Sequence, residues 1–175
     1  MDEAKEVASP AWYLVAMAVF AIGWNGGVWW AGQAWDLVRE APITSANQAL
    51  QAEGQSIAVF TDVVQANRRI ICSMSDVVRE ARPQPIAPAP IPLTVEDDGA
   101  TWTLIAFEHE GRDNVTVSCA PKDKQVDNAQ YAYATIDGYN ARLWTGNVVS
   151  MAAIVLALAI GIVIFRIRRR QLRTQ

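Results

Sequence analysis

The sequence predicts a membrane α+β protein, in which two transmembrane helices flank a small antiparallel β-rich, sandwich-like domain held outside the cytoplasm. Two uncharged apolar runs lie near the ends of the 175-residue chain, at residues 11–32 and 147–165. The middle of the chain, residues 33–146, carries fifteen acidic and nine basic side chains, whereas the last ten residues carry five arginines and no acid. The middle also holds both cysteines and several short runs rich in β-forming residues.

Both apolar runs have the length and the flanking residues of transmembrane helices. Residues 11–32 cover roughly 33 Å as a helix, and residues 147–165 cover roughly 28 Å, against a hydrocarbon core of roughly 30 Å. Aromatic rings, which favour the headgroup level, mark the edges of the runs at Trp12, Tyr13, Trp29, Trp30, Trp35, Trp144 and Phe165. The two runs are therefore predicted to span the plasma (inner) membrane.

The arginines after the second run set the predicted orientation. Cytoplasmic flanks of membrane helices are rich in Lys and Arg, so we expect the tail 166–175, with Arg166, Arg168, Arg169 and Arg170, to be cytoplasmic. Two spans then place the leader 1–10 in the cytoplasm and residues 33–146 outside it. A cleaved signal peptide is the alternative for the first run, although its leader is acidic and its apolar run is long.

Small residues recur at helical spacing in both runs. Gly23 and Gly27 form a GxxxG step, and Ala153, Ala157 and Gly161 recur every four residues. Such spacing lets helix backbones approach closely, although glycine and alanine are also common in membrane helices without this role. The amide of Asn25 is costly in hydrocarbon unless it is hydrogen-bonded, so we expect Asn25 to face protein or to reach interfacial water. These six residues are the predicted helix-packing set.

The middle of the chain predicts one short helix and then strands. After Pro42, Thr44 or Ser45 is expected to cap a helix over residues 47–53, which Gly54 ends. Alternation and β-forming residues predict strands at residues 56–61 and 69–74 and a hairpin of residues 101–108 and 114–119. Residues 81–92 contain five prolines, which predicts an extended surface connector that is neither a helix nor an inner strand.

The two cysteines, Cys72 and Cys119, each lie in a predicted strand, 47 positions apart. An exported domain is oxidised, so we expect a disulfide, which by loop entropy contributes roughly 3–4 kcal/mol. The alternative is a cytoplasmic domain, in which we expect both cysteines to be buried free thiols.

The residues with catalytic or ligating chemistry are few. His109 is the only histidine and lies between Glu108 and Glu110, where strand alternation points it away from both, so we interpret this segment as a solvated hairpin tip. No nucleophile, phosphate-loop or metal-protease motif is present in the sequence. We therefore expect a non-enzymatic protein without metal or cofactor. The net charge of −3 argues against a nucleic-acid partner.

Several of these features occur together in a known group of proteins. They are the Gly54–Thr61 run GQSIAVFT, the strand ending at Cys72, the hairpin strand VTVSC ending at Cys119, and a second span ending in arginines. In this the chain resembles actinobacterial, notably mycobacterial, two-span envelope proteins. The resemblance implies an accessory subunit of a larger complex, such as the Mce lipid-import transporter, packed on its permease or another membrane subunit. A membrane-anchored ligand or lipid sensor is the alternative.

Overall fold

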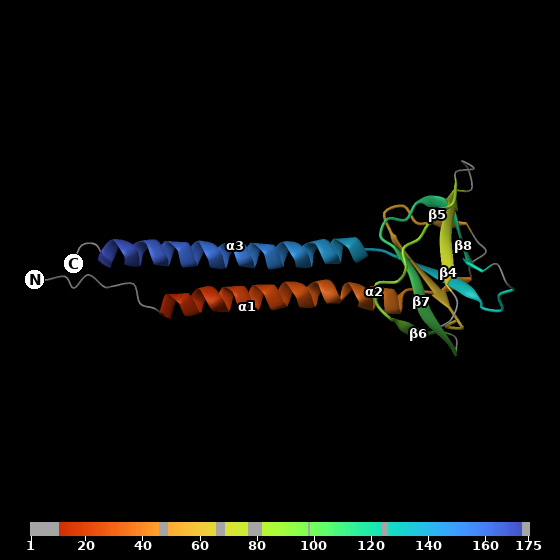
Figure 1. Cartoon of the computed structure of the whole chain (residues 1–175), viewed down its shortest axis with the longest axis horizontal. Helices are drawn as coiled ribbons and strands as arrows, with labels where there is room; N and C mark the ends of the chain where they lie inside the picture. Colours follow the sequence, from red (N-terminus) through yellow and green to blue (C-terminus); the bar gives the residue numbers. More distant parts are fainter. Residues whose placement is uncertain are drawn as a thin grey trace, which may run out of the picture. The chain divides into compact units, whose positions relative to one another are not determined.

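The computed structural model describes residues 11–45, 49–65, 69–76, 82–97, 99–123 and 126–172. The leader 1–10, for which a cytoplasmic location was predicted, lies outside these residues. The chain divides into two compact units, one made of residues 1–33 and 141–175 and the other of residues 34–140. The first contains the long helices and the second contains the β-sheets (Figure 1).

Two antiparallel helices make up the first unit, α1 (Ala11–Gly32) and most of α3 (Tyr139–Leu172). Both are long and apolar enough to cross a bilayer. Helix α1 has the predicted bounds, whereas α3 begins at Tyr139 instead of residue 147 and continues past residue 165 through the arginines. Arginine is a good helix former and no proline interrupts the segment, so the end of the apolar run does not end the helix.

A short helix opens the second unit. Helix α2 (Ala34–Glu40) follows a turn at Gln33 and buries Ala34 and Val38 completely. Asp36 and Arg39 form an ion pair one turn apart on its exposed side. The helix is amphipathic, because the buried residues are four positions apart and therefore share one face.

The first sheet has five antiparallel strands in the order β1-β9-β3-β7-β6. Their bounds are β1 (Thr44–Ser45), β3 (Ser56–Thr61), β6 (Thr94–Asp97), β7 (Ala100–Glu108) and β9 (Tyr131–Ile136). All six residues of β3 are buried, as expected for a central strand whose two faces are covered.

The second sheet has four antiparallel strands in the order β2-β8-β4-β5. Their bounds are β2 (Leu50–Gln51), β4 (Ile70–Asp76), β5 (Gln84–Pro85) and β8 (Asp113–Pro121). The helix predicted over residues 47–53 is wrong where the structure describes it, since Leu50 pairs with Val115 and is buried in the core. Residues 46–48 lie outside the described part.

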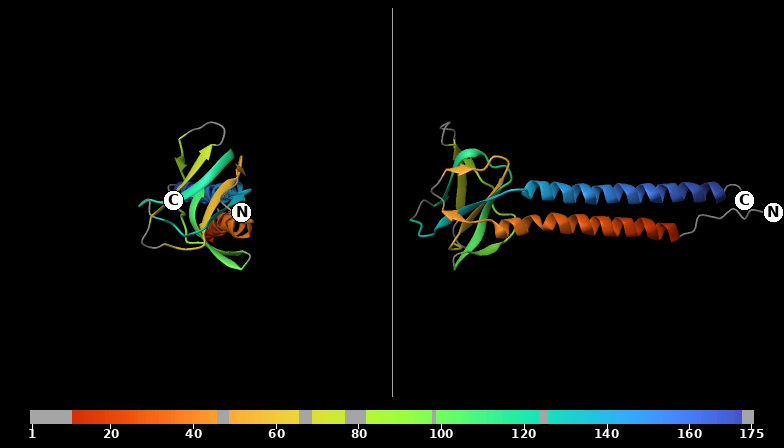
Figure 2. Two further views of the ribbon diagram at one scale, coloured as in Figure 1. Left: turned by 90° about the vertical axis from the view of Figure 1, so that its right-hand side faces the viewer. Right: turned by 180° about the vertical axis from the view of Figure 1, so that it is seen from behind.

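Residues from both sheets form one hydrophobic core. Figure 2 shows the strands of the β domain in two further views. The predicted hairpin is wrong in its pairing: β7 and β8 follow each other along the chain, but β7 pairs with β3 and β6 in the first sheet, whereas β8 pairs with β2 and β4 in the second. The chain crosses between the sheets after β7, so that both strands contribute to the shared core. The predicted alternation of β8 holds, because Val115 and Val117 both point into this core. The core residues are Leu50, Ala52, Ile57, Val59, Cys72, Met74, Ile86, Ala106, Val115, Val117 and Tyr133. The antiparallel β-rich domain predicted from the sequence is therefore present.

Candidate functional site

A seam of small residues joins α1 to α3. A Cβ atom added at Gly23 would lie 2.3 Å from the Cβ of Ala153, and one added at Gly27 would lie 2.2 Å from the Oγ of Ser150. Gly146 is equally confined, because its added Cβ would lie 2.6 Å from the carbonyl oxygen of Gly27. Only glycine fits at these three positions, so the two backbones approach as closely as the small residues allow.

The seam differs from the predicted packing set in its second half. Gly161 has no atom within 4 Å of an added Cβ, and Ala157 is half-buried, so the alanine–glycine stripe meets α1 mainly through Ala153. The structure instead uses Gly146 and Ser150, whose Oγ donates to the carbonyl of Trp24 over 3.4 Å. The spacing of Gly146, Ser150 and Ala153 was the sequence signal for this contact, because residues three or four positions apart lie on the same face of a helix.

Arg142 holds the two helices together beside this seam. Its guanidinium donates to the carbonyl of Gln33 over 3.2 Å and lies over the ring of Trp30 at 5.9 Å from the centroid. The last carbonyls of a helix have no partner within the helix and attract cations. Arg142 therefore contributes a hydrogen bond and a cation–π contact where α1 ends.

Asn25 and Gly26 lie on the side of α1 that faces away from the seam. Asn25 is exposed, and its Nδ2 donates to the carbonyl of Ala21, four residues earlier in the same helix, over 2.7 Å. Gly26 is also exposed, with no atom within 4 Å of an added Cβ. Asn25 therefore does not face α3.

The basic residues predicted to set the topology lie in the last described turns of α3. Arg166, Arg169 and Arg170 are exposed, and Arg168 is half-buried. They follow Phe165 and the apolar part of the helix, where cations also complement the negative end of the helix dipole.

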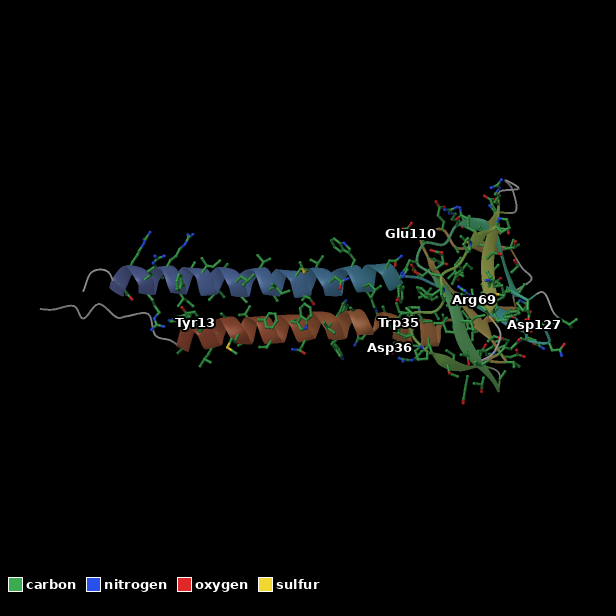
Figure 3. The ribbon with its side chains drawn as sticks, in the orientation of Figure 1. Tyr13, Trp35, Asp36, Arg69, Glu110 and Asp127 are labelled. Atoms are coloured by element: carbon green, nitrogen blue, oxygen red, sulfur yellow. A yellow bond between two sulfur atoms is a disulfide. The ribbon has the colours of Figure 1, made fainter. Side chains whose placement is uncertain are left out.

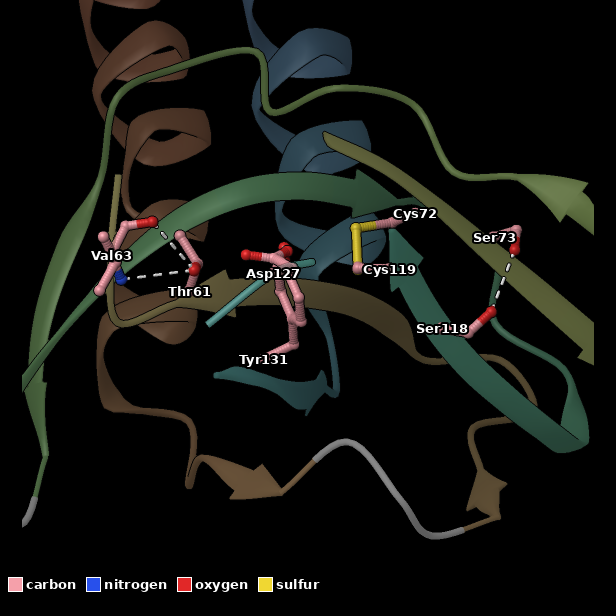
Figure 4. Close-up of a disulfide and its surroundings, with 8 residues drawn as sticks. All are labelled: Thr61, Val63, Cys72, Ser73, Ser118, Cys119, Asp127 and Tyr131. Carbon is pink, nitrogen blue, oxygen red and sulfur yellow. Dashed lines mark hydrogen bonds between the residues drawn. A yellow bond between two sulfur atoms is a disulfide. The ribbon is translucent and has the colours of Figure 1, made fainter. Parts of the chain in front are cut away.

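Cys72 and Cys119 form a disulfide between directly opposed residues of β4 and β8 (Figure 4). The carbonyl of Cys72 accepts from the N–H of Ile86, which shows that the Cys72 backbone points away from β8. Such non-hydrogen-bonded pairs bring opposed side chains closest, so the register of the two strands positions the bridge. Ser73 and Ser118, the next pair, contact each other through their hydroxyls at 3.2 Å.

The proline-rich segment connects the two sheets. Its N-terminal part belongs to the second sheet, because β5 pairs with β4 and Ile86 N–H donates to Cys72 over 2.9 Å. The chain then moves to the first sheet, where Ala87 accepts from Phe107 over 2.9 Å and Ala89 donates to Ile105 over 3.0 Å. The expectation of an extended surface connector holds for the described residues 82–92, most of which are exposed. The segment also hydrogen-bonds to both sheets at their edges, where proline is tolerated.

A groove opens where β4 and β7 separate beside this segment. It has a volume of about 540 Å³, and backbone and charged groups contribute to an otherwise apolar lining. The residues at its rim and walls include Arg69, Ile71, Ile86, Pro88, Ile105 and Glu108. Arg69, labelled in Figure 3, forms no ion pair within the described part of the chain, and Glu108 accepts from the N–H of His109.

His109 contacts an aromatic cluster, although its side chain is exposed. Its ring centroid lies 5.1 Å from that of Phe107 and 5.7 Å from that of Tyr139, and the Trp35 ring lies 5.3 Å from Phe107 and 5.2 Å from Tyr139. The carbonyl of His109 accepts from Ser56 and from Asn140. His109 and Glu110 are exposed, as predicted, and the ring and carbonyl of His109 also contact Tyr139 and Asn140 at the start of α3.

The described residues include no group of three or more His, Cys, Asp or Glu side chains that could hold a metal ion. Comparison of the chain with protein-family models, with curated proteins and with solved structures yields no match.

Proposed function

We propose that the chain is a two-span membrane protein that acts as a non-catalytic accessory subunit of a multi-subunit envelope complex. In this proposal α1 and α3 cross the inner membrane, both termini are cytoplasmic, and the β domain is extracytoplasmic. The length and apolarity of the helices, the arginines after the second apolar run and the disulfide support this orientation.

The observation that carries the proposal is the exposed amide of Asn25 on the free side of α1. One of its N–H groups donates to Ala21, which leaves a second N–H and the amide oxygen for other partners. Hydrocarbon offers none, whereas a neighbouring transmembrane helix can, and exposed Gly26 beside it lets such a helix approach closely. The free side of α1 therefore suits contact with another membrane subunit.

Because the seam lies between two helices of the same chain, the proposed partner subunit would contact other residues. Gly23, Gly27 and Ala153 pack against residues of the same chain and are occupied. The partner would contact the remaining faces, where α1 exposes Phe20, Trp24 and Val28. On the sequence resemblance alone, we propose a lipid importer of the Mce type as the complex and its permease as a partner.

A membrane-anchored ligand or lipid-binding module is the second candidate. The groove between β4 and β7 favours it, because a volume of about 540 Å³ falls within the range of small-molecule sites. In this candidate the helices serve only as an anchor, and the chain functions without a stoichiometric partner.

Purification of the full chain from native membranes in mild detergent separates the two candidates. An accessory subunit is expected to co-purify with a stoichiometric membrane partner, and Asn25→Leu is expected to weaken that association while Asn25→Gln, which keeps the amide, retains it. Recovery of a free monomer under these conditions, with Asn25→Leu behaving as the unchanged chain, would contradict the proposal.

A further inference from the structure

We infer that an extended segment of a partner polypeptide binds in the groove by adding to the edge of β4 at Arg69–Cys72, which no strand of the described residues covers. The inference rests on the proposed function and names the part of the partner that the β domain recognises: a short strand with apolar residues, an acidic residue and a basic residue.

The first support is the edge itself. Along β4, only Ser73 and Met74 pair with β5, and Cys72 accepts one further bond from Ile86 before the chain leaves for β7. The carbonyl of Arg69 accepts from Lys122, on the β8 side. Because backbone groups alternate in direction along a strand, those of Ile70, like those of Cys72, point away from β8 toward the groove.

The second support is how the other sheet edges are protected. Strands β1 and β2 have two residues each, β5 includes Pro85, and the edge strand β6 carries Glu96 and Asp97. Short, proline-containing and charged edges resist the addition of strands. The open stretch at Ile70 and Ile71 belongs to the seven-residue strand β4 and carries neither proline nor charge, and the Ile71 side chain is 42% exposed.

The third support is the chemistry of the groove. Partly buried Ile70 and Ile105 pack at the margin of the inter-sheet core, so an added strand with apolar side chains would cover that margin. Arg69 precedes β4 and Glu108 ends β7, and neither forms an ion pair within the described residues. An acidic side chain near Arg69 and a basic one near Glu108 would complement them. Main-chain bonds supply affinity in this recognition mode, and the side chains supply specificity.

The test uses the full-length chain in native membranes with a photo-crosslinking phenylalanine analogue at Ile71, or at exposed Val64 as a control outside the groove. We expect an adduct from position 71 whose partner peptide maps to one extended segment carrying both charges. Arg69→Glu is expected to lower the adduct yield roughly fivefold, the upper range for one exposed charge pair, whereas Arg112→Glu, an equal charge change outside the groove, leaves it unchanged.

Hydrogen exchange reports the backbone pairing that a simple contact would not produce. In the co-purified complex, the amide of Ile70 is expected to exchange at least roughly tenfold more slowly than in the isolated chain. A partner that co-purifies while position 71 gives no protein adduct, or gives a lipid adduct, overturns the inference and leaves the accessory role intact. Equal adduct yields in Arg69→Glu and Arg112→Glu also overturn it. Absence of any co-purifying partner overturns the proposed function itself.

Discussion

Two neighbouring glycines of α1 have opposite surroundings. Gly27 is buried in the seam, where an added Cβ would lie 2.2 Å from Ser150 Oγ and 2.6 Å from the Gly146 carbonyl oxygen. Gly26, the next residue in the helix, has no atom within 4 Å of that position. A methyl group at Gly27 must therefore separate the helices, whereas one at Gly26 meets open space.

Gly27→Ala is accordingly expected to destabilise the helix pair by about 1–3 kcal/mol, the usual cost of overpacking. Gly26→Ala is its matched control and should stay within about 0.5 kcal/mol of the unchanged chain, since it adds the same group without a clash. Denaturant unfolding in detergent, followed by tryptophan fluorescence, measures both. Equal effects of the two substitutions would mean that the seam does not hold α1 to α3.

Tyr133 gives the β domain a dependence on alkaline pH. Burial raises the pKa of its phenol above the ordinary value of 10.0, because the interior disfavours the charged form. The folded state then holds the proton more tightly than the unfolded state. The resulting stability is complete below pH 10 and is lost as the pH rises through the folded-state pKa.

Tyr133→Phe keeps the ring and removes the titrating hydroxyl. The free energy of unfolding of this variant should fall less steeply above pH 10 than that of the unchanged chain, with no difference in slope near neutral pH. Denaturant titrations at a series of pH values give the two slopes. Parallel slopes throughout would show that Tyr133 ionises equally in the folded and unfolded states.

At the scale of elements, the sequence predicts those strands that are amphipathic or bounded by clear turns. The run at 56–61 and the strands β7 and β8 were located to within about two residues by β-forming residues and alternation. That β7 and β8 belong to different sheets instead of forming a hairpin was not predicted, because local sequence does not show with which distant strand each one pairs. Strand β9 was missed, because Ala132 and Ala134 are buried on one face and Tyr133 on the other. A strand covered on both faces shows no polar alternation, and alanine is a weak β-former.

The sequence did not predict which residues surround the groove, because the packing of the two sheets brings them together. Prolines correctly predicted an extended backbone, but the segment's partners, Cys72 on β4 and Ile105 and Phe107 on β7, are fixed by how the sheets pack. The helix expected over 47–53 failed similarly, since burial of Leu50 between the sheets outweighs a weak local helix signal.

The disulfide acts at this scale by joining β4 to β8 in one register. Replacing both Cys72 and Cys119 with serine is expected to lower the free energy of unfolding of the β domain by roughly 3–4 kcal/mol, the loop entropy of the 47-residue separation. The unchanged chain with reductant should show the same loss, while reductant should leave the double variant unaffected. Identical unfolding curves with and without reductant would contradict this role.

At the scale of the whole molecule, charge and composition predicted the division of the chain into a helical and a β-rich part. Only part of the helix-packing set was predictable from the sequence. The spacing of small residues identifies the packing face of a helix, but it does not show over what length the neighbouring helix contacts that face. Gly161 lies on the stripe but outside the contact, whereas Gly146 and Ser150 lie inside it. The exposed state of Asn25 likewise follows from which face of α1 packs on α3.

The central claim is that α1 and α3 cross the membrane with the β domain outside and the arginine-rich end inside. Single cysteines at Val126, which is 87% exposed, and at Gln171 near the end of α3 test it directly by reaction with a membrane-impermeant maleimide. In intact cells the reagent should label Val126→Cys and leave Gln171→Cys unlabelled until the membrane is opened. Labelling of Gln171→Cys in intact cells, or of Val126→Cys only after lysis, would contradict the account.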